Sequence, residues 1–168
     1  GDMIKKVAVP IGENMTMGEL HDELKVKGAE LLLEVIEDIE AGKAQPEKQS
    51  EEEATYASLL KREMESIDWS KNATDIHNLI RGFNPAPGAF TKLPDGKNLK
   101  IWGSRLTDKA TTAEPGTVVE ATKHSFFVAC GNGVLEIIEV QPESKKRMAA
   151  QVFINGRGVQ VGDVLGKE

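Results

Sequence analysis

The stretch SFFVACGNGVLEIIEV, residues 125–140, contains two β-rich runs on either side of Asn132-Gly133. Asn-Gly readily accepts the two positive φ angles that a type I′ hairpin turn demands. The stretch therefore predicts two antiparallel strands joined by a tight turn, and it forms the centre of a β-rich domain.

Further short runs with strand character precede this hairpin. They are GAFTKL (88–93), NLKIWGSRL (98–106) and GTVVEAT (116–122), and turn signals such as Asp95-Gly96 and Pro115-Gly116 separate them. A short helix with Asn72 and Asp75 at its start and Gly82 at its end is predicted before them, and another at 149–155. VGDVL finishes as a strand or an extended tail. Strands at this spacing predict a small closed or nearly closed barrel, and a compact domain at residues 67–168.

The N-terminal part has a different pattern. KKVAVPI (5–11) alternates well enough to predict a strand, and Thr16 and Glu19 form a capping box that starts a long helix. The helix carries one apolar stripe, and Gly42 stands at its C-terminal cap. The stripe is formed by Leu20, Leu24, Leu31, Leu32, Val35 and Ile39. Such a helix normally lies across a sheet several strands wide, so residues 1–42 are interpreted as one part of a larger α/β domain.

Between these parts, residues 43–66 are interpreted as a linker, because a proline, an acidic cluster and little apolar periodicity favour solvated chain.

Charge is distributed unevenly across the sequence. The net charge of -6 is the sum of -8 for residues 1–60 (6 Lys/Arg, 14 Asp/Glu) and +2 for residues 61–168 (15 and 13). Any surface for a polyanionic partner is therefore expected in the second part.

The residues give no sign of a catalytic or metal site. The three histidines, His21, His77 and His124, have no second ligand at a metal-binding spacing, and His21 and His77 are expected on solvated helix faces. Cys130 lies in an apolar run and is expected to be a buried, inert thiol. No apolar run is long enough for a membrane span, and no signal peptide pattern is present, so a cytoplasmic protein with no membrane contact is expected.

Two basic groups stand out. Lys61 and Arg62 close the linker, and Lys145, Lys146 and Arg147 follow the last predicted strand. One interpretation is solvated turns; the other is contact with phosphates, in which clustered cations displace condensed counterions. The aromatic side chains mostly fit core positions, which favours a grip on the backbone of structured RNA over the reading of bases in a single strand.

Several strings together resemble one family in sequence order. They are ENMTMGELHDELKVKGAELLLEVIEDIEAGKAQPEKQ, ATYASLLKREMESIDWS, LIRGFNPAPGAFTKL, LKIW, GNGVLEIIEVQPESKKRM and the closing VGDVL. In combination they resemble the second half of methionyl-tRNA formyltransferases, over essentially the whole chain.

The resemblance implies an α+β chain. Residues 1–42 would be the last strand and helix of a Rossmann-like formyltransferase domain, residues 43–66 a linker, and residues 67–168 an OB-like, tRNA-binding barrel. In this family an Asn, a His and an Asp transfer a formyl group from 10-formyltetrahydrofolate to the amine of initiator methionyl-tRNA. All three, and the folate pocket, would lie upstream, so the chain alone is expected to be inactive and to bind no cofactor or metal. A monomer is expected.

The resemblance also implies which cations face the acceptor arm of the tRNA: Arg62, Arg81, Lys145, Lys146 and Arg147. The sequence departs from the family at Leu59, where a Lys is usual, at Ser66 for an Arg, at Ala86 for a Trp, and at Ser144 for a Gly. Leu59 and Ser66 remove two candidate phosphate contacts from the linker. The alternative is a structural barrel of a related folate-dependent formyltransferase or hydrolase acting on a small substrate, such as an amino sugar.

Overall fold

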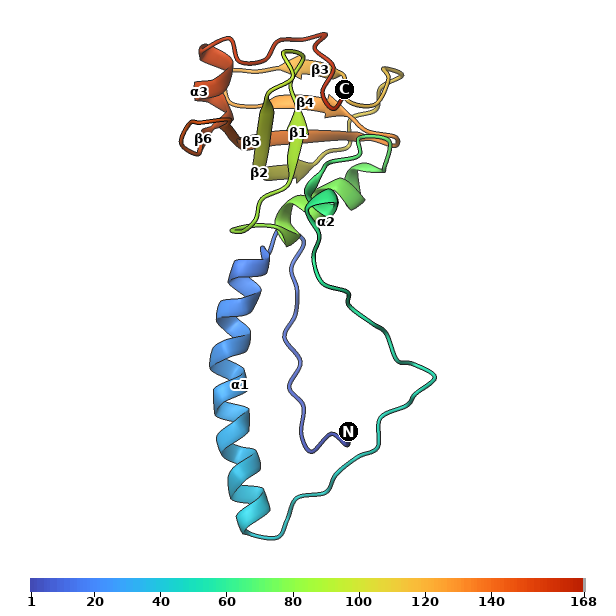
Figure 1. Cartoon of the computed structure of the whole chain (residues 1–168), viewed down its shortest axis with the longest axis vertical. Helices are drawn as coiled ribbons and strands as arrows, with labels where there is room; N and C mark the ends of the chain where they lie inside the picture. The colour runs from blue at the N-terminus through green and yellow to red at the C-terminus, as the bar shows by residue number, and fades with distance from the viewer. Residues whose placement is uncertain (168) are drawn as a thin grey trace. The chain divides into compact units, whose positions relative to one another are not determined.

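The computed structural model describes residues 1–167, and it divides the chain into one unit formed by residues 1–60 and a second that begins at Lys61. The chain is α+β (Figure 1). Its elements are α1 (Met17–Glu40), the 3-10 helix η1 (Arg62–Glu65), α2 (Ala73–Gly82), β1 (Phe90–Lys92), β2 (Asn98–Leu106), β3 (Val118–Ala121), β4 (Phe126–Ala129), β5 (Val134–Pro142), β6 (Met148–Ala149) and α3 (Ala150–Asn155).

In the first unit, α1 starts and ends as its sequence predicts. The Thr16 hydroxyl accepts a hydrogen bond from the backbone N–H of Glu19 (3.3 Å), and the Glu19 carboxylate accepts one from the backbone N–H of Thr16 (2.8 Å). Gly42 follows the helix with a φ of +67°, a conformation that favours glycine. These contacts confirm the capping box and the terminating glycine.

The predicted strand at residues 5–11 is wrong. Among the described residues this segment pairs with nothing, and the backbone bridge closest to it joins Met3 to Glu47. A strand needs a partner for its backbone N–H and C=O groups, and within residues 1–60 no second strand offers one. Lys5 is instead held by ion pairs with Glu34 (2.8 Å) and Asp38 (3.3 Å) of α1.

The apolar stripe of α1 is only partly covered within the described structure. No residue of α1 is buried: Leu20, Leu31 and Val35 are half-buried, and Leu32 and Ile39 are more than half exposed. A helix in water derives most of its stability from packing such a stripe, so burial against a further apolar surface would stabilise α1.

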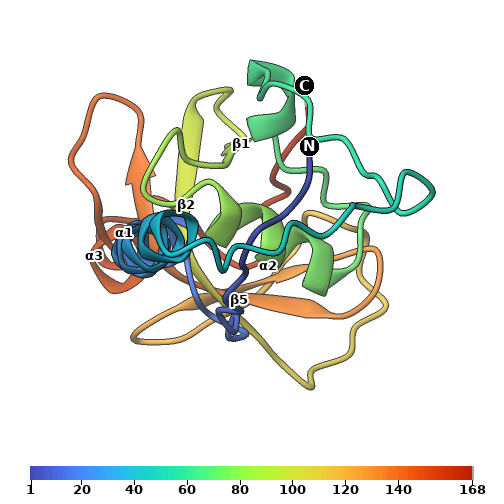
Figure 2. The same ribbon diagram turned by 90° about the horizontal axis from the view of Figure 1, so that it is seen from below.

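The second unit is built on one antiparallel sheet of six strands, in the order β1-β2-β5-β4-β3, with β6 also paired to β5 (Figures 1 and 2). The five predicted strand runs correspond to β1–β5, and the two predicted short helices to α2 and α3. The two-residue strand β6 was not predicted, because so short a segment has no periodicity of its own.

Strand β5 is long enough to serve two partners along one edge. β4 pairs with residues 134–137, and β6 pairs with Glu139 and Val140 further along. On its other edge β5 pairs with β2 along nearly its whole length, with irregular register around Gly103. Such β-bulges increase the local twist, which allows the sheet to curl.

The curled sheet is a half-barrel, and the C-terminal segment spans its open side. Gly166 N–H donates to the Lys92 carbonyl of β1 (2.8 Å), Leu165 N–H donates to the Gly116 carbonyl (2.8 Å), and Val164 forms a bridge with Thr117 next to β3. The sequence predicted either a strand or an extended tail for VGDVL, and the structure shows the extended tail. No backbone pairing joins β1 directly to β3 among the residues described.

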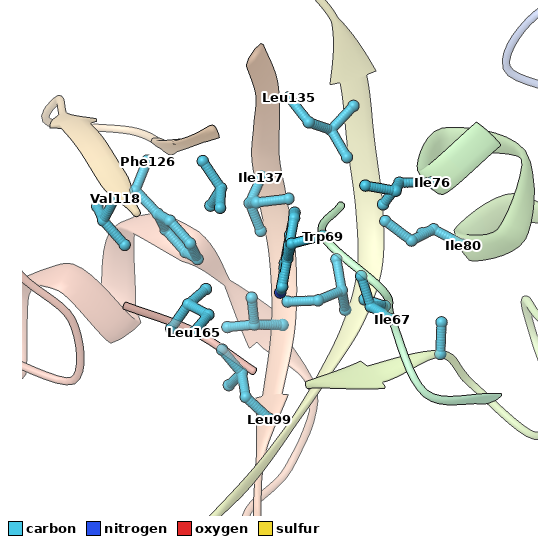
Figure 3. Packing of buried hydrophobic residues seen from close by; sticks show 14 of the residues in the cluster. Ile67, Trp69, Ile76, Ile80, Leu99, Val118, Phe126, Leu135, Ile137 and Leu165 are labelled. Atoms are coloured by element: carbon cyan, nitrogen blue, oxygen red, sulfur yellow. The ribbon is translucent and has the colours of Figure 1, made fainter. Parts of the chain in front are cut away.

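The core fills the concave side of the sheet beneath α2, and Figure 3 shows side chains from distant segments meeting there. Phe126, Leu135 and Ile137 come from β4 and β5, and Ile76 and Ile80 come from α2. All five are at most 1% exposed. Trp69 packs in the same cluster, and its indole N–H donates to the Thr91 hydroxyl (2.9 Å), so the one polar atom of this ring has a partner.

The β4–β5 hairpin is confirmed, but its predicted turn type is wrong. Ala129 pairs with Val134, so the loop contains four residues, and only Gly133 of the Asn132-Gly133 pair has a positive φ (+86°). The loop conformation is set by the segment before α2. Gly131 N–H donates to the carbonyls of Trp69 (2.9 Å) and Lys71 (2.8 Å), and the Asn132 carbonyl accepts from Ala73 N–H (2.9 Å).

This close backbone approach requires glycine at position 131. A Cβ atom there would lie 1.8 Å from the Ser70 carbonyl oxygen. We predict that Gly131→Ala lowers the free energy of unfolding by about 1–3 kcal/mol, as overpacking does elsewhere. The control is Gly82→Ala at the end of α2, where a Cβ meets nothing within 4 Å and stability is maintained. Urea unfolding measures both, and equal stability of the two variants would contradict this role of Gly131.

Cys130 is buried at 5% exposure at the end of this hairpin strand, as predicted. Burial disfavours the charged thiolate and raises the pKa of Cys130 to about 11. We predict that the native protein at pH 8 reacts with a thiol reagent only as fast as it unfolds, while urea-unfolded chain reacts at once. Rapid labelling of the native protein at pH 8 would show that the thiol is accessible and ionised.

Candidate nucleic-acid interface

The connection between β5 and β6 carries the cations that the sequence singled out. Lys145 N–H donates to the Pro142 carbonyl (3.1 Å), and Ser144 adopts a φ of +61°, a left-handed conformation that favours glycine. Lys145 and Lys146 are exposed. Neither side chain has a hydrogen-bond or ion-pair partner among residues 1–167, so both charges are available to an anion in solution.

The turn is tied firmly to the neighbouring strand. Glu143 N–H donates to the Asn98 carbonyl (3.0 Å), and the Glu143 carboxylate accepts from Asn98 N–H (3.0 Å). The Gln141 side chain also donates to the Lys145 carbonyl (2.9 Å). The two lysines therefore project from backbone that is fixed on both sides.

Arg147 differs from the two lysines because its charge is compensated. Its Nε and Nη2 atoms donate to the two carboxylate oxygens of Glu139, at 2.6 and 2.5 Å, and its guanidinium lies 4.9 Å from the Trp102 ring centroid. Nη1 also reaches the Asn84 side-chain oxygen at 3.5 Å. A planar guanidinium that pairs in this bidentate way and stacks on a ring has little capacity left for a further partner.

Trp102 organises this corner of the sheet. It is the unmatched residue of the β2 bulge, since Ile101 faces Val140 while Gly103 faces Glu139. Both Ile101 and Trp102 are buried, but Trp102 lies outside the main core cluster. The loop after α2 covers its ring so closely that a Cβ at Gly88 would lie 2.5 Å from it. The burial of Trp102 agrees with the expectation that the aromatic side chains mostly fit core positions, and Gly103 inside the strand run marks the bulge beside it.

Lys100 is a further cation that the sequence did not single out. Its Nζ donates to the Pro87 carbonyl (2.6 Å) and lies 5.5 Å from the Trp102 ring centroid. It also lines a pocket that includes Arg62 and Phe90. Nothing in the sequence distinguishes this lysine from others, because its position depends on how the loop after α2 folds back onto β2.

Arg62 lies in η1, which is attached to the sheet. Ile67 N–H, just after η1, donates to the Phe90 carbonyl of β1 (2.8 Å). Arg62 is exposed, and its side chain has no partner within the described part of the chain. It shares its pocket with one carboxylate, that of Glu65.

Arg81 lies in the last turn of α2 and is half-buried. Its Nε donates to the Asn78 side-chain oxygen (2.8 Å), and a cation in this position also interacts favourably with the negative end of the helix dipole. Its carbonyl accepts from Asn84 N–H (3.4 Å), so Arg81 leads directly into the loop that covers Trp102.

The structure thus brings several of the five predicted cations to one part of the second unit. Arg62 shares a pocket with Lys100, and Lys100 and Arg147 both contact Trp102. The turn that carries Lys145 and Lys146 continues directly into Arg147. Of the five, Arg62, Lys145 and Lys146 present uncompensated charge, whereas Arg81 and Arg147 have side-chain partners within the protein.

Two further polar groups of the second unit, His77 and Asp68, form hydrogen bonds within the protein. His77 was expected to be solvated, but it is 3% exposed, because α2 turns it toward β2, where Nδ1 lies 2.9 Å from the Ser104 hydroxyl oxygen. The pKa of Asp68 is lowered by hydrogen bonds from the Ser70 hydroxyl and N–H, so this carboxylate stays ionised in a local turn. Within residues 1–167, no three His, Cys, Asp or Glu side chains gather as metal ligands, and no helix is both long and apolar enough to span a membrane.

Comparison with known proteins gives a consistent picture. The chain is 52% identical to a methionyl-tRNA formyltransferase of Bacillus subtilis over 167 residues, which are 99% of this chain and 52% of the relative. It is 50% identical to one of Symbiobacterium thermophilum, covering 96% of this chain and 50% of the relative. The chain therefore spans about half the length of the curated relatives it matches.

Solved structures share the fold at low sequence identity. HypX from Aquifex aeolicus in complex with tetrahydrofolic acid superposes with a TM-score of 0.66 at 18% identity, covering 94% of this chain and 28% of HypX. An N-formyltransferase from Helicobacter canadensis, in complex with folinic acid and dTDP-3-aminofucose, gives a TM-score of 0.59 at 22% identity and covers 84% and 50%.

The family described as "Formyl transferase, C-terminal domain" matches residues 59–158, which contain η1, α2, the whole sheet and α3. This chain belongs to that family.

Proposed function

We propose that this chain is the tRNA-holding portion of a methionyl-tRNA formyltransferase, an enzyme that formylates initiator methionyl-tRNA from 10-formyltetrahydrofolate. The identity of 41–52% to methionyl-tRNA formyltransferases over nearly the whole chain carries the proposal. The uncompensated charges of Lys145 and Lys146, on a turn fixed to the sheet, supply its physical basis.

In this proposal the five cations Arg62, Arg81, Lys145, Lys146 and Arg147 form the tRNA-binding site. The uncompensated members, Arg62, Lys145 and Lys146, neutralise phosphates of the acceptor arm, and each displaces condensed counterions from the RNA. Binding the tRNA by parts remote from the reacting amine orients that amine toward the formyl carbon. Binding energy used in this way lowers the barrier of the chemical step rather than only tightening the complex.

The proposal includes a division of the chain. Residues 1–42 would be the end of a Rossmann-like formyltransferase domain, residues 43–66 a linker, and residues 67–168 an OB-like barrel. The partly exposed apolar stripe of α1 supports the first assignment, because a larger domain would bury it. The curled sheet whose open side is spanned by the C-terminal segment supports the last. Such an enzyme would act in the cytoplasm as a monomer.

The alternative, a structural barrel of an enzyme that acts on an amino sugar, has less support. The sugar N-formyltransferases that superpose on this chain are 21–22% identical, which supports a shared fold but no shared substrate. An uncompensated lysine pair on an ordered turn also has no evident use in a purely structural module.

The first test measures the salt dependence of tRNA binding. We predict that the chain binds initiator tRNA, and that affinity falls steeply as salt rises from about 50 to 200 mM. Replacing both Lys145 and Lys146 by Ala should make the slope of log K against log[salt] shallower by roughly one unit per lost phosphate contact. Fluorescence anisotropy with labelled tRNA provides the measurement.

The matched control is Lys71→Ala combined with Lys123→Ala, which removes two exposed cations outside the β5–β6 turn. It lowers the net charge equally, so a slope that changes only in the Lys145 and Lys146 variant locates the contact. Undetectable binding at low salt, or the same slope change in both variants, would contradict the proposal.

The second test concerns catalysis. We predict that this chain alone transfers no formyl group from 10-formyltetrahydrofolate to methionyl initiator tRNA, because the residues expected to transfer it lie outside the chain. Acid gel electrophoresis separates formylated from unformylated product, with a full-length methionyl-tRNA formyltransferase as the positive control. Formylation above background would show that residues 1–168 contain catalytic groups.

A further inference from the structure

We infer that Arg147 is a positioning residue that holds the Lys145–Lys146 turn against the sheet and leaves phosphate contact to the two lysines. The inference rests on the proposed tRNA-binding function and separates one of its five cations from the others. It is carried by the contacts around Trp102.

The charge of the Arg147 side chain is compensated within the protein, although the side chain is 39% exposed. Two of its nitrogens bind both carboxylate oxygens of Glu139, a third reaches Asn84 (3.5 Å), and the guanidinium covers Trp102 at 4.9 Å. Bidentate pairing fixes the plane of the guanidinium, and the ring fixes its position. To bind a phosphate through the same two nitrogens, Arg147 would have to release Glu139.

Trp102 connects this arginine to the other end of the turn. Its ring lies against Arg147, and its indole N–H donates to the Gln141 side-chain oxygen (3.0 Å). The amide nitrogen of Gln141 in turn donates to the Lys145 carbonyl (2.9 Å). One buried ring is therefore linked to residues before, within and after the turn.

Backbone pairing also fixes the end of the turn at Arg147. Glu139 pairs with Ala149, and Val140 with Met148, so β6 begins immediately after Arg147. Residues 143–147 connect the paired strands β5 and β6, and Trp102 contacts Gln141 before this connection and Arg147 at its end. Lysines on such a loop lose less conformational freedom on binding than lysines on a mobile segment would.

The substitution Glu139→Gln distinguishes a phosphate-binding role of Arg147 from a positioning role, because the two roles predict opposite changes in tRNA affinity. If Arg147 contacts phosphate, Glu139 competes with the RNA, and Glu139→Gln should tighten binding by freeing the arginine and removing a repulsive charge. If Arg147 positions the turn, Glu139→Gln loosens the turn and weakens binding although the protein becomes more positive. Simple electrostatics cannot produce the second result.

The control is another ion pair next to an aromatic ring, that of Lys109 and Glu120. Lys109 binds Glu120 at 2.6 Å and lies 4.8 Å from the Phe127 ring centroid, and both charged side chains are partly exposed like those of Arg147 and Glu139. Glu120→Gln removes the same charge from a partly exposed ion pair, but it leaves the β5–β6 turn untouched.

The experiment compares the chain with its Glu139→Gln and Glu120→Gln variants in the anisotropy titration. We expect Glu139→Gln to weaken tRNA binding roughly 3- to 10-fold with the salt slope unchanged. Glu120→Gln should bind as well as the parent or slightly better. Amide hydrogen exchange at residues 143–147 should accelerate in Glu139→Gln alone.

Two variants of Arg147 itself complete the design. Lysine keeps the charge but cannot reproduce the bidentate, stacked geometry. Arg147→Lys and Arg147→Ala should therefore weaken binding to a similar extent, with the parent's salt slope. Full binding by Arg147→Lys, together with a shallower slope in Arg147→Ala, would identify a phosphate contact and overturn the inference.

The outcomes distinguish this inference from the function it rests on. If the unmodified chain shows no salt-dependent binding to tRNA, the proposed function fails and the inference fails with it. If the unmodified chain binds but Glu139→Gln binds more tightly, or if exchange in the turn is unchanged, only the positioning role of Arg147 is overturned.

Discussion

The pairing of β5 on both edges is the constraint on which the second unit depends. One edge pairs with β2 along nearly its whole length, and the other is shared by β4 and β6. Its inward side chains, Leu135, Ile137 and Val140, are fully buried in the core. Glu139 and Gln141 point away from that core, and it is from these positions that the β5–β6 turn is held.

Strand β2 links the core to the candidate interface. Successive side chains of a strand point to opposite faces of the sheet, so Ile101 lies in the main core cluster while Trp102 is buried outside it. The register shifts of β2 lie next to Gly103, where a Cβ would be 2.8 Å from the Ile138 side chain. Trp102, on the face away from the core, provides the platform for the arginine that follows the turn.

The cations of the site are of two kinds: some have no acidic partner in the described structure, and others are paired with a carboxylate. Lys145 and Lys146 extend from fixed backbone without acidic neighbours that bind them in the described structure, whereas the Glu139 carboxylate neutralises Arg147. Counting cations in the sequence treats these residues as equivalent. Their contacts give them different chemical roles, since only an uncompensated cation displaces counterions from a nucleic acid at full effect.

The sequence by itself determined the elements that depend on local chemistry. Thr16 and Glu19 cap α1, Asn72 caps α2, and the alternation and turn residues between positions 88 and 140 give five strands. It also identified Cys130 as buried and the family to which the chain belongs. These features follow from propensity, periodicity and motif, which act over a few residues.

Tertiary structure decided whatever depends on partners distant in the sequence. The run at 5–11 has strand character but no neighbouring strand among the described residues, so it forms none. The loop at Gly131 takes its shape from the carbonyls of Trp69 and Lys71, and His77 is buried because β2 lies opposite it. The difference between Arg147 and its neighbouring lysines likewise arises from Glu139 and Trp102, because a side chain's free charge is set by what packs against it in space.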